Sequence, residues 1–342
     1  MSSLSTAACG SAPADRMKKI YLIMPAMFLL LVPAITTLAW GQGAITVAAV
    51  TTTPQPALLD IAVDRGLFHE EGIEVRRLAA PTGRHALEMV LTGRADLAAV
   101  AETPIMAAIM GGQEIVVIAG IFKSDKSEMI VARKEAGIVK PRDLKGKSVG
   151  LTMGTSQAFF FDVFLARYGI PRKAVTMLDM KPDDYTRAFL EGKVGAIVTS
   201  IPRAPRLKKQ LGDKAVIFYG EGFYSETYNL VTTRSFAARA GGSLKKILRA
   251  LYLAEKFSQE RPSAAQDIVA RTTGVEAELV RSFWRDLRLQ LRLDQTLIAN
   301  LEHQARWSIR NKLIKKGSLP NFTYWMAADY LREVAPERVT LY

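Results

Sequence analysis

The sequence of 342 residues predicts an α/β protein with two sets of mostly parallel strands, and three observations favour this class. Short apolar runs alternate with helical patterns from residue 45 to about residue 233, which is typical of βαβ units. A polar break at 123–127 separates two such sets, and beyond Gly241 nearly every segment has a helical pattern. A composition of 49% hydrophobic and 23% charged residues is that of a folded globular chain and excludes a disordered one.

The N-terminus has the order of residues that is typical of a secretory signal. Basic residues at 16–19 precede an apolar stretch at 20–40, and Ala39 and Gly41 form a small-x-small site, which predicts a signal peptide over 1–41. The mature chain is then expected outside the cytoplasm. An uncleaved membrane anchor is the alternative, because the apolar stretch is long enough to span a bilayer, although prolines within it count against that reading.

The first set of elements reads as one compact α/β lobe. Its strands are predicted at 45–50, 74–78, 97–100 and 115–122, with helices at 57–65, 85–91 and 104–110 between them. Gly66 closes the first of these helices, as a glycine often does at a helix C-terminus.

The second set repeats the pattern after the polar break. Its strands are predicted at 128–132, 148–151, 175–179, 196–199 and 215–219, and its clearest helix at 156–168. The C-terminal third is helical, except for alternating leucines at 287–293 that fit a short strand. Asp294 is predicted to be the N-cap of a helix that continues to Leu313.

The two sets contain a faint internal repeat. The segment Leu91–Pro104 is echoed by Leu190–Pro202, and in each a glycine-capped helix is followed by an apolar strand and a polar pair. The repeat predicts two related lobes whose polar loops face one crevice.

Charge and residue usage exclude several function classes. The net charge is +13, but the basic residues are dispersed, with no basic run of five and no zinc-finger spacing, which favours a solvated surface and predicts no nucleic-acid binding. The single cysteine, Cys9, precedes the long apolar run, and His69, His85 and His303 are scattered. We therefore predict no enzyme activity, no catalytic residue, no metal site and no cofactor.

Three ordered segments carry a family resemblance. The stretches at 62–76 (AVDRGLFHEEGIEVR), 91–104 (LTGRADLAAVAETP) and 143–156 (DLKGKSVGLTMGTS) resemble the periplasmic solute-binding proteins of ABC importers. The most similar branch includes nitrate, sulfonate, taurine and thiamine-pyrimidine binders. The similarity runs in order from about residue 45 to residue 334.

The resemblance implies a two-lobed type II periplasmic binding protein fold. Its implied organisation is a first lobe of 42–124 plus 226–342 and a second lobe of 125–225, joined by two crossover segments, with the C-terminal helices on the first lobe. A monomer would hold a small-molecule ligand between the lobes by hinge closure and deliver it to an ABC permease. A periplasmic sensor module that reports to a receptor is the alternative.

Loops beyond the carboxyl ends of strands are expected to face the ligand in such folds. In the first lobe these loops offer Thr52, Thr53 and Gln55 after the first strand, and Thr82 and Gly83 after the second. Capping of the next helix is the alternative role for Thr52 or Thr53.

The third loop contains Glu102 and Thr103 where sulfonate and nitrate binders of the resembling branch carry small hydroxyl residues. A carboxylate repels an anion and accepts hydrogen bonds from amine, amide or hydroxyl donors, so Glu102 favours a ligand with a donor end. Its alternative role is an acid in the first helical turn. Gly195 is a second departure from the family, which usually has an aspartate there, as Asp96 is in the first repeat; we expect it to alter a structural bond.

The second lobe and the return crossover supply the remaining candidates: Thr155, Ser156, Gln157, Ser200, Tyr224 and Glu226. The first three open a helix, whose free N–H groups favour an anionic or carbonyl end of the ligand, unless they only cap it. Tyrosine adds a flat apolar wall, which favours an aromatic or heterocyclic ligand, although it could equally pack the hinge.

Overall fold

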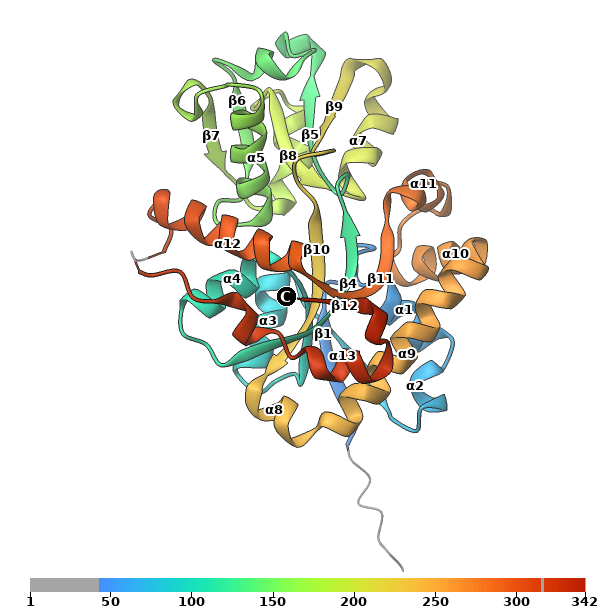
Figure 1. The fold of residues 1–342 in the computed structure, drawn as a ribbon. Helices are drawn as coiled ribbons and strands as arrows, with labels where there is room; N and C mark the ends of the chain where they lie inside the picture. The colour runs from blue at the N-terminus through green and yellow to red at the C-terminus, as the bar shows by residue number, and fades with distance from the viewer. Residues whose placement is uncertain (1–42, 315–316, 342) are drawn as a thin grey trace, which may run out of the picture. The chain divides into compact units, whose positions relative to one another are not determined.

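The computed structural model describes residues 43–314 and 317–341, and the predicted signal peptide at 1–41 lies outside the described residues. The described chain forms two sheets that are covered by helices, which confirms the predicted α/β class (Figure 1). Each sheet with its helices forms one lobe.

The first sheet has seven strands and combines the N-terminal strands with strands from the C-terminal third. In spatial order these are β12 (Val339–Thr340), β11 (Arg288–Asp294), β4 (Ile115–Ser124), β10 (Glu226–Thr233), β3 (Leu97–Ala101), β1 (Ile45–Ala49) and β2 (Val75–Ala79). The strands β2, β1 and β3 are parallel, whereas β10 is antiparallel to both of its neighbours.

The second sheet has five strands from the middle of the chain. In spatial order these are β7 (Thr176–Asp179), β6 (Ser148–Leu151), β8 (Ala196–Ser200), β5 (Glu128–Arg133) and β9 (Ala215–Tyr219). Here β7, β6 and β8 are parallel, and β5 is antiparallel to β8 and β9.

The burial of these strands explains why most of them can be predicted from the sequence. All five residues of β3 are buried, as expected for an interior strand that is covered on both faces. The strand β2 lies at the edge of the sheet, and none of its residues is buried. The β10 sequence ETYNLVTT is polar although seven of its eight residues are buried, and its polar character is why no strand was predicted there.

Two neighbouring segments connect the sheets. The chain passes from β4 through 125–127 to β5, and it returns from β9 through 220–225 to β10 (Figure 1). Glu226 pairs with Ser124 in the register of β10 and β4, so the two connections lie side by side where they leave the first sheet.

The helices have the following bounds: α1 (Ala57–Asp64), α2 (Leu67–Glu70), α3 (Gly83–Leu91), α4 (Glu102–Met110), α5 (Ser156–Arg167), α6 (Tyr185–Leu190), α7 (Arg203–Leu211), α8 (Arg234–Arg239), α9 (Gly241–Glu260), α10 (Pro262–Thr273), α11 (Ala277–Phe283), α12 (Gln295–Arg310) and α13 (Ala328–Val334). The C-terminal helices α9, α10 and α13 pack with α1 or with strands of the first sheet, as the predicted fold requires.

The long helix α12 begins as predicted and ends earlier than predicted. The Asp294 carboxylate accepts a hydrogen bond from the Thr296 backbone N–H at 3.0 Å, which confirms the N-cap. The helix ends at Arg310 and does not reach Leu313, because Lys312 has a φ of 58° in the left-handed region.

The two halves of the internal repeat occupy corresponding places, since β3 is parallel to β1 and β8 is parallel to β6. In the first half, Asp96 accepts hydrogen bonds from the backbone N–H and the hydroxyl of Thr46 at 2.8 and 2.7 Å. In the second half, Gly195 has no carboxylate to accept such bonds, whereas the backbone bond is kept: its N–H donates to the Ser148 carbonyl at 2.9 Å, as the Asp96 N–H donates to the Thr46 carbonyl at 3.0 Å. The departure at Gly195 therefore changes a bond between strands, as expected.

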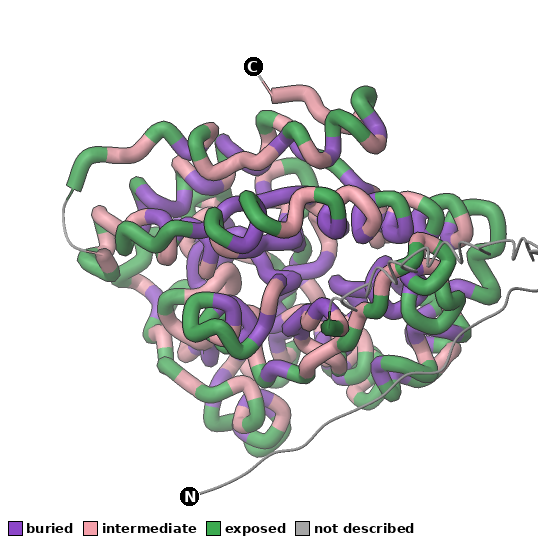
Figure 2. The backbone as a smooth tube through the Cα atoms, turned by 90° about the horizontal axis from the view of Figure 1, so that it is seen from below, coloured by how far each residue is buried: buried purple, intermediate pink, exposed green. Residues whose placement is uncertain are grey.

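Two clusters of buried apolar side chains form the core, and Figure 2 shows buried backbone between the exposed outer turns. The first cluster fills the first lobe and includes residues of α6 and α7 in the second. The other cluster lies around α5 and contains Phe160, Phe161 and Phe164. Trp307 of α12 also belongs to it, so a C-terminal helix takes part in the core of the second lobe.

Candidate functional site

Three buried glutamates gather where the two connections meet the sheets. Glu102 begins α4, Glu128 begins β5 and Glu226 begins β10, and their side chains are 0%, 3% and 3% exposed. Glu102 and Glu226 both raise the pKa of Glu128 by electrostatic repulsion, and Glu102 does the same to Glu226. We call these three residues the glutamate cluster.

Glu102 is surrounded by hydrogen-bond donors of the protein. Its Oε1 accepts from the Tyr224 hydroxyl at 2.7 Å and from the Gln304 amide at 2.9 Å. Its Oε2 accepts from the backbone N–H and the hydroxyl of Thr227 at 3.1 and 3.2 Å. Burial raises its pKa, and these donors partly offset the rise. In this structure Glu102 therefore orients Tyr224, and its contact with a ligand stays a prediction.

Glu226 has fewer partners than Glu102. Its Oε2 accepts a hydrogen bond from the Ser127 hydroxyl at 2.6 Å, and a hydrogen bond from the Gln55 side chain also stabilises the carboxylate. Burial, followed by repulsion from Glu102, raises the pKa of Glu226 to about 7. Oε1 of Gln55, which is 4% exposed, has no hydrogen-bond partner among the described residues.

Glu128 connects the cluster to the second lobe. Its Oε1 accepts from the Ser156 hydroxyl at 2.9 Å, and a hydrogen bond from Gln157 also favours the carboxylate. Burial, with repulsion from Glu226, nevertheless raises its pKa well above the ordinary value. Oε2 of Glu128 has no hydrogen-bond partner in the described part of the chain.

An aromatic group borders the cluster. The Tyr224 ring lies 5.7 Å from the rings of Phe159 and Phe160, and the Phe159 ring lies 5.5 Å from that of Trp307. The Trp307 indole N–H donates to Asp162 at 2.6 Å. Tyr224 thus packs against rings of α5 beside α12, as its alternative role in packing the hinge would have it, and its role as a wall for a ligand stays a prediction.

The structure brings seven of the predicted residues into this network. They are Gln55, Glu102, Thr103, Ser156, Gln157, Tyr224 and Glu226, of which Thr103 joins through its 2.7 Å hydrogen bond to the Gln304 side chain. Because Gln55 follows β1 and Ser156 begins α5, the network contains residues of both lobes.

The other candidates have different positions. Thr82 caps α3, since its hydroxyl accepts from the His85 backbone N–H at 3.4 Å. A Cβ at Gly83 would lie 3.5 Å from the Tyr228 hydroxyl, so the chain passes close to that tyrosine. The hydroxyl of Thr155 donates to the Thr152 carbonyl at 2.7 Å and does not cap α5.

The last three candidates, Thr52, Thr53 and Ser200, form no side-chain hydrogen bond with the described residues of this network. Thr52 is exposed and Thr53 is half-buried, and neither caps α1, whose N-cap is Pro56. Ser200 ends β8 and is half-buried.

Sequence reasoning missed Glu128, Ser127, Thr227 and Gln304. Glu128 was placed only as the first residue of a predicted strand, and a glutamate before an apolar run reads as a solvated strand end. Its neighbours Ser156 and Gln157 lie 28 and 29 residues further along the chain, so folding alone brings them together. Gln304 lies on α12, where its polar character matched an exposed helix face although it is fully buried.

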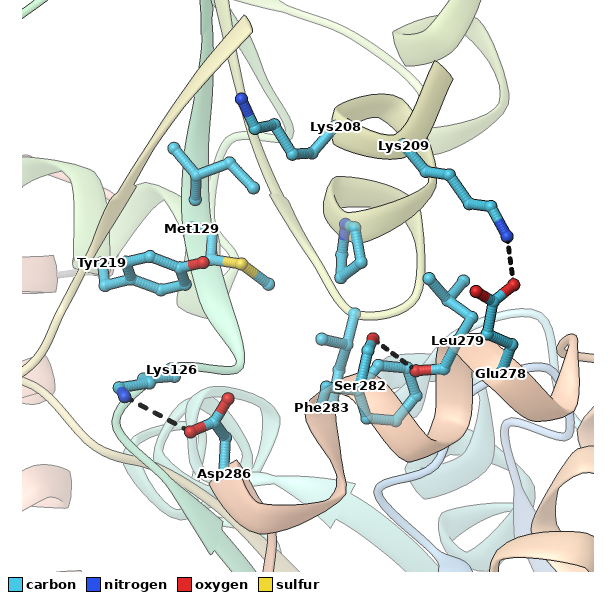
Figure 3. A pocket seen from close by; sticks show the side chains of 13 residues that line it. Lys126, Met129, Lys208, Lys209, Tyr219, Glu278, Leu279, Ser282, Phe283 and Asp286 are labelled. Carbon is cyan, nitrogen blue, oxygen red and sulfur yellow. Dashed lines mark hydrogen bonds and ion pairs between the residues drawn. The ribbon is translucent and has the colours of Figure 1, made fainter. Parts of the chain in front are cut away.

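A separate cavity of about 320 Å³ lies between α7 and α11, and none of the predicted site residues lines it (Figure 3). Ion pairs cross it from Lys209 to Glu278 at 2.5 Å and from Lys126 to Asp286 at 3.3 Å. Its lining also contains apolar residues of both lobes, such as Met129 and Phe283.

Two further properties concern the described residues only. No group of three or more histidine, cysteine, aspartate or glutamate side chains is arranged there to hold a metal ion. Within the same residues, no helix combines the length and the apolar character that crossing a membrane requires.

The family of the chain follows from its sequence profile. The profile of the family described as NMT1/THI5 like matches residues 53–265, which is more than half of the chain. The chain belongs to the NMT1/THI5-like family. This membership confirms the predicted resemblance.

Individual relatives have low sequence identity to this chain, but the alignments cover most of its length. A protein of Bacillus subtilis (strain 168) named "Putative aliphatic sulfonates-binding protein" is 23% identical over 263 residues, which are 75% of this chain and 79% of that protein. A Haemophilus influenzae protein named "Putative thiamine biosynthesis protein" is 21% identical over 217 residues, or 62% of this chain and 68% of the relative. The relatives thus include proteins named for sulfonates and for thiamine, as in the predicted branch.

Solved structures share the fold. The periplasmic aliphatic sulphonate binding protein SsuA from Escherichia coli superposes with a TM-score of 0.74 at 18% identity, covering 82% of this chain and 96% of SsuA. The desulfurization enzyme DSZB superposes with a TM-score of 0.64 at 15% identity, covering 86% and 99%. The fold therefore occurs in binding proteins and in at least one enzyme.

Proposed function

We propose that this protein is the solute-binding component of an ABC importer in the periplasm. It captures a small polar or heterocyclic organic molecule between its two lobes and delivers it, unchanged, to a permease. The lobe boundaries that we assign for this role are 42–124 with 226–342, and 125–225. Export would depend on the signal at 1–41.

One observation carries the proposal. Side chains of both lobes and of both connections donate hydrogen bonds to Glu102, Glu128 or Glu226, and electrostatic repulsion couples these three buried carboxylates. A ligand can hold two lobes together only through contacts that differ between the open and closed forms, and contacts with both lobes have this property. Gln55 and Ser156 represent the two lobes in this network. Gln55 follows β1 in the first lobe, and Ser156 begins α5 in the second.

Binding without chemical change is the second part of the proposal. The network contains carboxylates, amides and hydroxyls, and hydrogen bonds join these groups to one another. The relatives named for binding support this role. A carrier of this kind needs only micromolar affinity, or about 8 kcal/mol, which a few hydrogen bonds and a buried ring supply.

The test begins with the protein released from its own periplasm. Native mass spectrometry should detect a bound small molecule, and N-terminal sequencing should find Gln42 as the first residue. Adding the identified molecule to ligand-free protein should raise the melting temperature by mass action. Recovery of a chemically altered product would contradict the proposed function, and so would a melting temperature that no solute raises.

A further inference from the structure

Among the residues that the structure describes, the glutamate cluster has no counter-ion. Within residues 43–314 and 317–341, no lysine or arginine forms an ion pair with Glu102, Glu128 or Glu226. Buried ionised carboxylates are strongly unfavourable unless they are paired or well hydrogen-bonded. Elsewhere the chain follows this rule, since Glu255, which is 1% exposed, pairs with Arg338 at 2.9 Å.

The cluster also has a surplus of hydrogen-bond acceptors. Ser127, Ser156 and Tyr224 each use a hydroxyl proton to donate to a carboxylate. Oε2 of Glu128 and Oε1 of Gln55 are nevertheless without a donor among the described residues. Both side chains are more than nine-tenths buried, and Gln55 bonds directly to Glu226, so its free oxygen lies at the cluster.

An anionic group would be repelled by these carboxylates wherever they are ionised. A protonated amine has the opposite character, because an ammonium group carries one positive charge, three hydrogen-bond donors and no acceptor. Glu128, Glu226 and Gln55 offer the matching set of two carboxylates and one amide oxygen. They come from β5 in the second lobe, from the start of β10 in the first sheet and from the loop after β1.

We propose that the ligand carries a protonated amine, which binds against Glu128, Glu226 and Gln55 in the glutamate cluster. This inference rests on the proposed solute-binding function and specifies its ligand class. Because the three residues come from different parts of the fold, the same ammonium group links the lobes and supplies the missing counter-ion. Glu102 already accepts four hydrogen bonds from the protein, so we assign it to positioning Tyr224 and not to binding the amine.

The test compares matched compounds that differ only by the amine. Suitable pairs are 2-aminoethanesulfonate with ethanesulfonate, 1,4-diaminobutane with butane-1,4-diol, and benzylamine with benzyl alcohol, together with whatever compound accompanies the protein from its periplasm. Isothermal titration calorimetry measures each affinity for the wild type, Glu128→Gln and Glu226→Gln. Glu255→Gln is the control, because it neutralises a buried glutamate on α9 outside the cluster. Circular dichroism confirms that each variant is folded.

The expected result is that the binding compound contains an amine and that its amine-free counterpart binds at least tenfold more weakly. Each cluster variant should lose at least tenfold in affinity, equivalent to about 1.4 kcal/mol, whereas the control should retain it. If one of the two cluster variants fails to fold, the affinity of the other variant still tests the inference. An amine-free solute that binds wild type and both cluster variants equally would overturn the inference and leave the proposed function intact. If no tested or co-purified solute binds, the proposed function fails, and the inference fails with it.

Discussion

Replacing Glu226 with glutamine should remove a pH dependence of stability that its carboxyl group imposes. Burial and repulsion from Glu102 raise the pKa of Glu226 from the ordinary 4.5 to about 7. A shift of about 2.5 units at about 1.4 kcal/mol per unit corresponds to about 3 kcal/mol. The side chain is only 3% exposed, so little of this energy is screened by water.

The sign follows from the direction of the shift. The folded protein holds the proton of Glu226 more tightly than the unfolded chain does, so the contribution to stability is complete below pH 4.5. It is lost as the pH rises through about 7, because the unfolded chain then releases a proton that the folded chain retains. Ligand-free wild type should therefore become less stable from pH 4.5 to pH 7.5.

Guanidinium unfolding followed by circular dichroism measures this effect. Between pH 4.5 and 7.5 the free energy of unfolding of Glu226→Gln should rise by about 3 kcal/mol relative to wild type. Glu88→Gln, which changes an exposed glutamate of α3, should track the wild type and serves as the control. Carbon-13 NMR of the glutamate carboxyls gives the pKa directly. Parallel pH profiles for wild type and Glu226→Gln, or a carboxyl that titrates near 4.5, would refute the reasoning.

Three further substitutions test the surroundings of the cluster. Tyr224→Phe removes a hydroxyl that donates to the buried Glu102 and should reduce the free energy of unfolding by about 2 kcal/mol in denaturant titrations. Trp307→Ala removes a buried ring that packs on α5 and should reduce it by about 3 kcal/mol; a loss below about 1 kcal/mol would contradict the assigned packing. Lys209→Ala breaks an exposed ion pair with Glu278, so the melting temperature should stay nearly unchanged at low and high salt.

Most strands could be predicted from the sequence because a buried strand consists mainly of apolar residues. An interior parallel strand such as β3 (LAAVA) is a continuous apolar run, and the glycines at positions 93 and 192 mark the turns before two such strands. The strand β10 lacks such an apolar run. Its residues are buried among polar partners, as when Thr227 donates to Glu102, and a polar buried strand resembles a loop.

The candidate site was predictable only in part, for a similar reason. Loops after strands can be found from the order of elements, which is how Gln55, Glu102 and Ser156 were selected. Whether a side chain in such a loop meets the ligand or caps a helix depends on distances that the sequence does not contain. Thr82 caps α3, while Glu128 was missed because its partner Ser156 comes from another element.

The position of Trp307 has a practical consequence. This indole belongs to a C-terminal helix, yet it is 7% exposed in the core of the second lobe and donates to Asp162. Any rotation that separates α12 from α5 would move it from an apolar to an aqueous surrounding and shift its fluorescence emission to longer wavelength. The protein thus carries a built-in optical reporter of lobe separation that needs no attached dye.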